Sequence, residues 1–147
     1  MLRRMACGTL ICAMAALTGS CSDSTTGLTP TPPPITEVFD GTLNPVSTTV
    51  HSFITLVGGP VTVSLTAVGP DATKPIGFSL GTFNATLNIC SVVFDNPAAL
   101  QGAEFNANAS TTGIYCARLY DNGSVAAAAA DGSATSFTYQ VTVVHPQ

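Results

Sequence analysis

The feature that most limits the fold of this chain is a two-residue alternation of apolar and hydroxyl side chains. It is clearest in residues 61–67 (VTVSLTA), and it recurs in residues 137–143 (FTYQVTV). A period of two is that of a β-strand with one buried face. We therefore predict that the apolar members of the first segment point inward: Val61, Val63, Leu65 and Ala67.

Glycine, proline, asparagine and aspartate interrupt the chain between such segments, as they do in all-β domains. We predict eight strands, at residues 37–41, 48–57, 61–67, 76–83, 87–94, 103–109, 113–120 and 137–143. Gly58-Gly59-Pro60 predicts a hairpin turn between the second and third. The alanine-rich residues 125–130 are too few for a stable isolated helix, so we expect a loop there, with at most one helical turn. The predicted fold is all-β, an antiparallel two-sheet β-sandwich of jelly-roll or Greek-key type.

The N-terminal residues 1–20 have the pattern of a signal peptide. Arg3 and Arg4 precede an apolar run at residues 6–17, which is shorter than the roughly 20 residues of a membrane-spanning helix. The small residues that follow lead to Cys21. This junction resembles the bacterial lipobox, in which the cysteine is lipidated, although Thr18 stands where leucine is usual. The alternative is plain secretion.

Residues 21–34 predict a flexible tether behind the lipidated Cys21. Four prolines and no apolar period prevent this Pro/Thr-rich segment from burying enough surface to fold. Residues 35–147 then form the β-sandwich domain. The expected location is the bacterial cell envelope, with the domain anchored by lipid and facing the periplasm or the exterior.

The cysteine count supports one disulfide. Cys7 and Cys12 would leave with the signal peptide and Cys21 would carry lipid, so Cys90 and Cys116 remain as a pair. An exported protein meets oxidising conditions in which such a pair is bridged. With no CxxC motif and two histidines in the whole chain, we predict no metal site and no cofactor.

The excess of acidic over basic residues limits the classes of partner that the protein can bind. Beyond Cys21 the chain has two basic residues, Lys74 and Arg118, against eight acidic ones. Such a surface has no electrostatic footprint for nucleic acid or for anionic lipid headgroups. The expected partners are the membrane, through the N-terminal lipid, and a surface glycan or an envelope protein. We expect a monomer.

One motif points to catalysis. Residues 77–81 (GFSLG) fit G-x-S-x-G, with Asp95 or Asp121 and then His145 following Ser79 in the order of the α/β-hydrolases. That motif needs a helix directly after the serine, whereas residues 82–87 favour strand or turn. A strand that contains glycine is therefore favoured over a small serine hydrolase, and we predict that the protein is not an enzyme.

The candidate ligand-binding residues are Tyr115, Tyr120 and Asp121. Tyr115, Tyr120 and Tyr139 could stack on sugar rings if exposed, which makes a carbohydrate-binding module the main alternative function, although tyrosines in alternating strands are more often core residues. Asp121 opens an Asp-Asn-Gly segment that could supply an oxygen to calcium, but Asn-Gly is first a turn signal.

Seven short segments together resemble one family: residues 39–43, 51–53, 60–65, 80–82, 113–116, 139–143 and 145–146. On these the domain is similar to the bacterial pre-peptidase C-terminal family of β-sandwiches. The resemblance implies a non-catalytic accessory domain that aids secretion, attachment or the stability of a neighbour. The expected function is therefore that of a non-catalytic envelope lipoprotein module with a binding or structural role.

Overall fold

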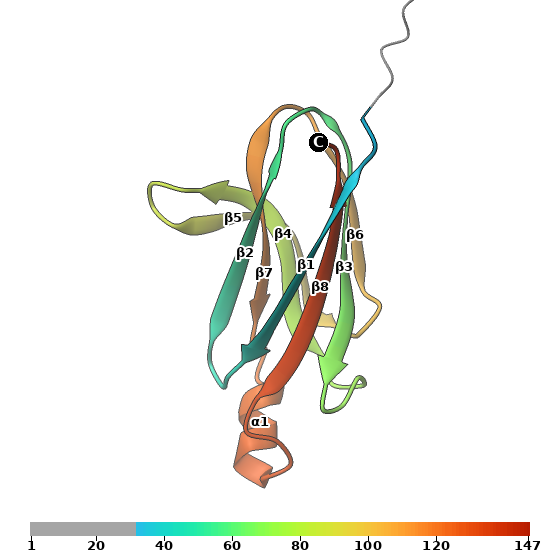
Figure 1. The fold of residues 1–147 in the computed structure, drawn as a ribbon. Coiled ribbons are helices and arrows are strands. Elements are labelled where there is room, and N and C mark those ends of the chain that lie inside the picture. The colour runs from blue at the N-terminus through green and yellow to red at the C-terminus, as the bar shows by residue number, and fades with distance from the viewer. Residues whose placement is uncertain (1–31) are drawn as a thin grey trace, which may run out of the picture. The chain divides into compact units, whose positions relative to one another are not determined.

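The computed structural model describes residues 32–147, which form eight strands and one helix (Figure 1). The predictions for the signal peptide and for Cys21 lie outside the described residues. Within 32–147 no helix is long and apolar enough to cross a membrane. The elements are β1 (Ile35–Leu43), β2 (Thr48–Thr55), β3 (Gly59–Gly69), β4 (Ile76–Asn84), β5 (Ile89–Ala99), β6 (Glu104–Ala109), β7 (Gly113–Tyr120), α1 (Ser124–Asp131) and β8 (Phe137–His145).

The strands form two four-stranded antiparallel sheets. Sheet A has the order β1-β8-β3-β6 and sheet B the order β2-β7-β4-β5. Only β4 and β5 are consecutive in the chain and also neighbours in a sheet, so every other connection crosses from one sheet to the other. This is the jelly-roll form of a β-sandwich, and it confirms the predicted fold class.

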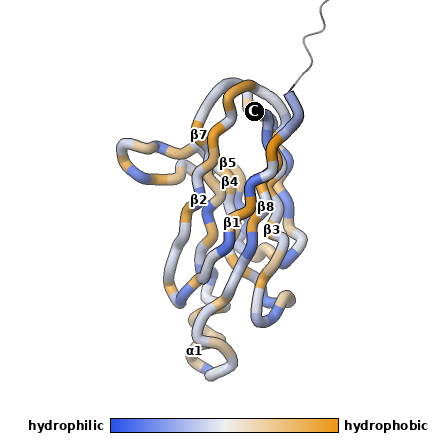
Figure 2. The backbone as a smooth tube through the Cα atoms, viewed as in Figure 1, coloured by the Kyte–Doolittle hydropathy of each residue, from blue (hydrophilic) through white to orange (hydrophobic). Residues whose placement is uncertain are grey.

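The core between the sheets consists of the apolar side chains that alternate with polar ones along the strands. Along β8, Phe137, Tyr139, Val141 and Val143 are all buried, while the residues between them are not. Figure 2 shows the corresponding change between hydrophobic and hydrophilic residues along β1 and β8. Phe53 and Phe78 of sheet B lie in the same buried cluster. The pattern of β8 was predicted correctly from its period alone.

The predicted hairpin at Gly58-Gly59-Pro60 is wrong. β2 pairs with β7 in sheet B, whereas β3 begins at Gly59 and pairs with β6 and β8 in sheet A. The segment therefore carries the chain from one sheet to the other. The turn residues mark the right place, but they do not reveal which strand becomes the partner.

The inward position predicted for Ala67 is also wrong. The β3–β8 register shifts between Leu65 and Ala67, which is a β-bulge. The extra residue reverses the alternation, so that Ala67 is exposed and Val68 enters the core in its place.

The loop predicted at residues 125–130 is a helix, α1. Its Val125 and Ala128 are buried, and Gly132 ends it in the left-handed conformation with φ 76°. Packing and end-capping thus stabilise a helix that would not form alone. Its N-terminus is capped by Asp121, as described below.

Candidate binding surface on sheet B

A disulfide bond shapes the outer face of sheet B. Cys90 of β5 and Cys116 of β7 are bridged, with 5.9 Å between their Cα atoms. β4 lies between these strands, and two strand spacings in a flat sheet would separate them by about 9.5 Å. β5 must therefore curl over β4 at this point. The predicted disulfide is confirmed, and it staples the β4–β5 hairpin across the sheet.

Gly81 makes this crossing possible. A Cβ atom added at Gly81 would collide with the main-chain oxygen of Ser91, which passes directly over it. The β4–β5 register also shifts between Leu80 and Gly81. The second glycine of the G-x-S-x-G motif is thus explained by the close approach of two backbones.

The stapled hairpin projects from the sandwich, as Figure 1 shows. Its turn is closed by the main-chain N–H of Leu87, which donates to Oδ1 of Asn84 over 3.0 Å. Residues 84–89 are exposed and include no charged residue. Leu87 and Ile89 keep 63% and 48% of their surface exposed. The hairpin therefore presents apolar side chains on a fixed, convex element.

A groove lies beside the base of this hairpin. It has a volume of about 500 Å³, and its apolar lining includes Ile54, Leu56, Phe83 and Ile114. Ile54 of β2 pairs directly with Ile114 of β7, and the β4–β7 register ends with Thr82 opposite Tyr115, one residue before Phe83. Ile54 and Leu56 are more than half exposed. Glu37, Ser52 and Gln147 also line this groove, so the apolar side chains of the hairpin lie beside a groove of mixed lining.

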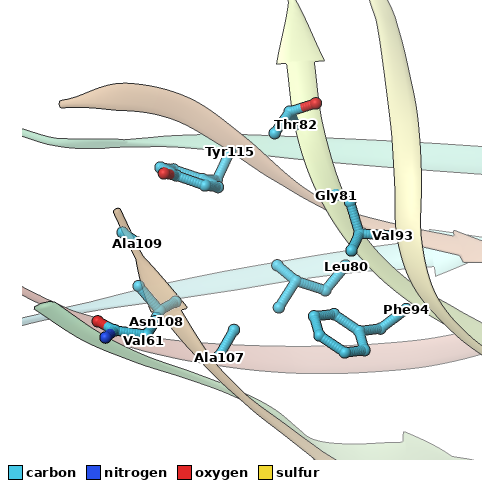
Figure 3. Close-up of a pocket in the computed structure, with 10 residues that line it drawn as sticks. All are labelled: Val61, Leu80, Gly81, Thr82, Val93, Phe94, Ala107, Asn108, Ala109 and Tyr115. Atoms are coloured by element: carbon cyan, nitrogen blue, oxygen red, sulfur yellow. The ribbon is translucent and has the colours of Figure 1, made fainter. Parts of the chain in front are cut away.

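A second, smaller cavity of about 110 Å³ opens between the sheets, where β4 and β5 face β6 (Figure 3). Leu80, Phe94 and Ala107 line its floor, and Tyr115 stands at one side. The ring of Phe94 stacks on Phe105 at 6.1 Å. This cavity is a gap in the core packing that is open to the edge of the sandwich.

A polar cluster occupies the other half of the outer face of sheet B. The hydroxyl of Ser79 donates to Oδ1 of Asp95 over 2.7 Å, and the hydroxyl of Tyr120 donates to the same carboxylate at 3.1 Å. Burial and Asp95 together raise the pKa of Tyr120, while Arg118 opposes them. Tyr120 is therefore a neutral donor that holds Asp95 in place.

The ring of Tyr120 is covered. A Cβ atom at Gly77 would collide with the centre of this ring, and the guanidinium of Arg118 lies over the ring at 4.6 Å. The first glycine of the G-x-S-x-G motif, Gly77, is thus explained by the packing of the Tyr120 ring against it. A ring packed in this way is not an open platform for a sugar.

Asp121 organises the loop end of the sandwich. Its Oδ1 accepts hydrogen bonds from the N–H groups of Gly123 and Val125, and its Oδ2 accepts them from Val46 and Ala126. Burial raises the pKa of Asp121, but these four hydrogen bonds outweigh it and the net pKa lies below the ordinary value. The carboxylate caps α1 and joins it to the β1–β2 turn.

The three predicted ligand-binding residues do not share one site. Tyr115 points between the sheets and stacks on Phe53 at 5.9 Å. Tyr120 points outward from the same strand, and Asp121 lies in the loop after it. Their separate positions follow from the alternation of a strand, which the sequence already displays.

The hydrolase arrangement predicted as an alternative is not assembled. Ser79 is fully buried in sheet B with Asp95 as its partner, whereas His145 is fully buried in sheet A. Nε2 of His145 lies 2.8 Å from Glu37, and its Nδ1 lies 3.0 Å from the carbonyl oxygen of Pro146. Nor does the described part of the chain gather three metal-ligating side chains at one place.

The exposed hairpin residues Leu87 and Ile89 were not predicted as binding residues from the sequence. The run of three apolar residues from Val92 to Phe94 could have indicated an exposed apolar surface here. Three consecutive apolar residues place apolar groups on both faces of a strand. Asp95, Pro97 and two register shifts against β4 protect the edge strand β5 from pairing, whereas residues 84–89 of the hairpin carry no charge.

Comparison with known proteins supports the fold. No family model and no curated protein matches this chain. Among solved structures it is similar to the Yersinia pseudotuberculosis-derived mitogen and to Aeromonas hydrophila PliG, a periplasmic lysozyme inhibitor of g-type lysozyme. Each match has a TM-score of 0.50 and 14% sequence identity, and covers 76% of this chain and 86% of the other. Both are bacterial proteins with the same sandwich architecture.

Proposed function

We propose that this chain is a non-catalytic binding module of the bacterial cell envelope, tethered by lipid on Cys21, that docks onto a protein through the β4–β5 hairpin. The observation that carries the proposal is the exposure of Leu87 and Ile89 on a hairpin stapled by a disulfide. A binding element that is already ordered loses little conformational freedom on association.

The shape and charge of the molecule support a particular kind of partner. A convex hairpin beside a partly apolar groove suits a protein with a cleft and a raised apolar rim. Residues 32–147 contain seven acidic and two basic residues, which favours a partner surface of net positive charge. The similarity to PliG makes a g-type lysozyme the first partner to test.

An enzyme assay tests this function. We expect the protein to slow the clearing of a peptidoglycan suspension by g-type lysozyme, and Leu87→Asp to remove the effect. Val38→Asp is the matched control, because Val38 is 51% exposed on sheet A and the substitution adds the same charge. Equal lysozyme rates with and without the wild-type protein would reject a lysozyme as the partner.

Membrane tethering needs its own test. Metabolic labelling with palmitate should mark the wild-type protein and leave Cys21→Ala unmarked. If both are marked equally, or neither is, the lipid anchor is rejected and the protein is a secreted one.

The carbohydrate-binding alternative has less support. Tyr115 faces the core and the ring of Tyr120 is covered by Gly77 and Arg118. A glycan array tests the alternative. If the wild type and Leu87→Asp both bind a specific glycan, carbohydrate binding is favoured over protein binding through the hairpin.

A further inference from the structure

Arg118 is a cation on the outer face of sheet B that has no acidic partner. Its neighbours Ala117 and Leu119 are fully buried, so the side chain of Arg118 points away from the core. Its Nε atom is excluded from solvent and finds no hydrogen-bond acceptor among residues 32–147. The one contact of a basic with an acidic side chain within 4.0 Å in this stretch is that of His145 with Glu37, and it does not include Arg118.

The nearby acid is engaged elsewhere. Ser79 lies between Arg118 and Asp95 in the register of the sheet, so all three stand in one row. Asp95 accepts hydrogen bonds from Ser79 and Tyr120 rather than from the arginine. The guanidinium is held instead by the ring of Tyr120. The structure therefore fixes a planar cation, and because its Nε is shut off from solvent, the Nη groups are the donors left to an outside group.

We infer that Arg118 is a binding site for a carboxylate group of a ligand. The planar guanidinium offers parallel N–H donors that match the two oxygens of a carboxylate. A dianionic phosphate fits less well, because a single cation faces it and the charge of Asp95 repels each added negative charge. This inference is independent of the hairpin and of the proposed function.

The test is a titration followed through the Nε–H resonance of Arg118 in the full chain by ¹H–¹⁵N NMR. Arg118→Lys assigns that resonance by its disappearance. Sodium acetate is the probe, and acetamide, sodium phosphate and sodium chloride at equal ionic strength are the comparisons. Lys74→Gln is the matched control, since it removes the other basic residue of the described chain.

We expect acetate to shift the resonance in a saturable way, in the wild type and in Lys74→Gln alike. Main-chain amides around Arg118 should follow the same curve, and Arg118→Lys should weaken it about tenfold through the loss of a charge-assisted hydrogen bond. No saturation with acetate, tighter binding of phosphate, or equal binding by Arg118→Lys would overturn the inference.

Two further probes identify the source of the carboxylate. N-acetyl-glutamate amide represents an acidic side chain of a protein, and glucuronate represents an acidic sugar. Tighter binding of the first supports a protein ligand, and tighter binding of the second supports an acidic glycan. If neither competes with acetate, the carboxylate assignment is wrong.

Discussion

Removal of the Cys90–Cys116 disulfide should destabilise the domain by an amount that follows from the length of the closed loop. The two cysteines are 26 residues apart. In the chain-entropy model, a loop of this length lowers the entropy of the unfolded chain by about 12 cal/mol/K, or about 3.5 kcal/mol at 25 °C. A domain of this size has a total stability of roughly 5–15 kcal/mol, so the loss is a large fraction.

The measurement is urea unfolding of the wild type and of the double variant Cys90→Ala, Cys116→Ala. We expect the free energy of unfolding to fall by about 3.5 kcal/mol, and the amides of residues 84–92 to exchange with solvent faster than those of β8. Dithiothreitol should shift the wild type in the same direction and leave the double variant unchanged. If the double variant lost less than about 1 kcal/mol and exchange at the hairpin were unaltered, the disulfide would not be the staple described here.

Three further predictions concern single residues. Asp121→Ala should lower the free energy of unfolding by about 2 kcal/mol at pH 7, the value of a strong helix cap. Because folding lowers the pKa of Asp121, the stabilisation by this residue is complete above the ordinary pKa of 3.8 and is lost as the pH falls through the folded pKa. The stabilities of wild type and variant should therefore converge in acid unfolding curves. Gly81→Ala should destabilise the domain by about 1–3 kcal/mol because the backbone at Ser91 must move. Thermal unfolding beside Gly113→Ala checks this, because an added Cβ at Gly113 would come no closer than 3.3 Å to a neighbouring atom, in the ring of Tyr115. Ser79→Ala should cost about 1.5–3 kcal/mol, the value of a hydrogen bond to a charged group, and should leave lysozyme inhibition unchanged. A loss of inhibition in a variant that keeps its fold would place Ser79 in the functional site.

Local patterns in the sequence predicted the strands but not their arrangement. The alternation in residues 137–143 identified β8 and four of its buried residues correctly, because burial on one face depends on the strand itself. The position of the turn at Gly58 was predicted correctly, but the pairing of the two strands that it joins was predicted wrongly. Pairing in a jelly roll depends on contacts far apart in the chain, such as that of Thr48 with Tyr120, and a single sequence does not display these.

The candidate surface depended even more on distant contacts. The pairing of Cys90 with Cys116 could be predicted by counting, but the curl of β5 over Gly81 could not, because it needs the position of the intervening strand. The helix α1 was missed for a similar reason. Its cap, Asp121, lies outside the alanine run, and its buried residues Val125 and Ala128 belong to a core cluster built from distant parts of the chain.

The most direct test of the proposed function is a calorimetric binding titration of g-type lysozyme with the wild type, Leu87→Asp and Val38→Asp. The account predicts saturable binding by the wild type, the same affinity for Val38→Asp, and an affinity at least about 30-fold lower for Leu87→Asp, as for a central interface residue. Equal affinities for all three proteins, or no heat of binding from the wild type, would contradict the hairpin as the binding element for this partner.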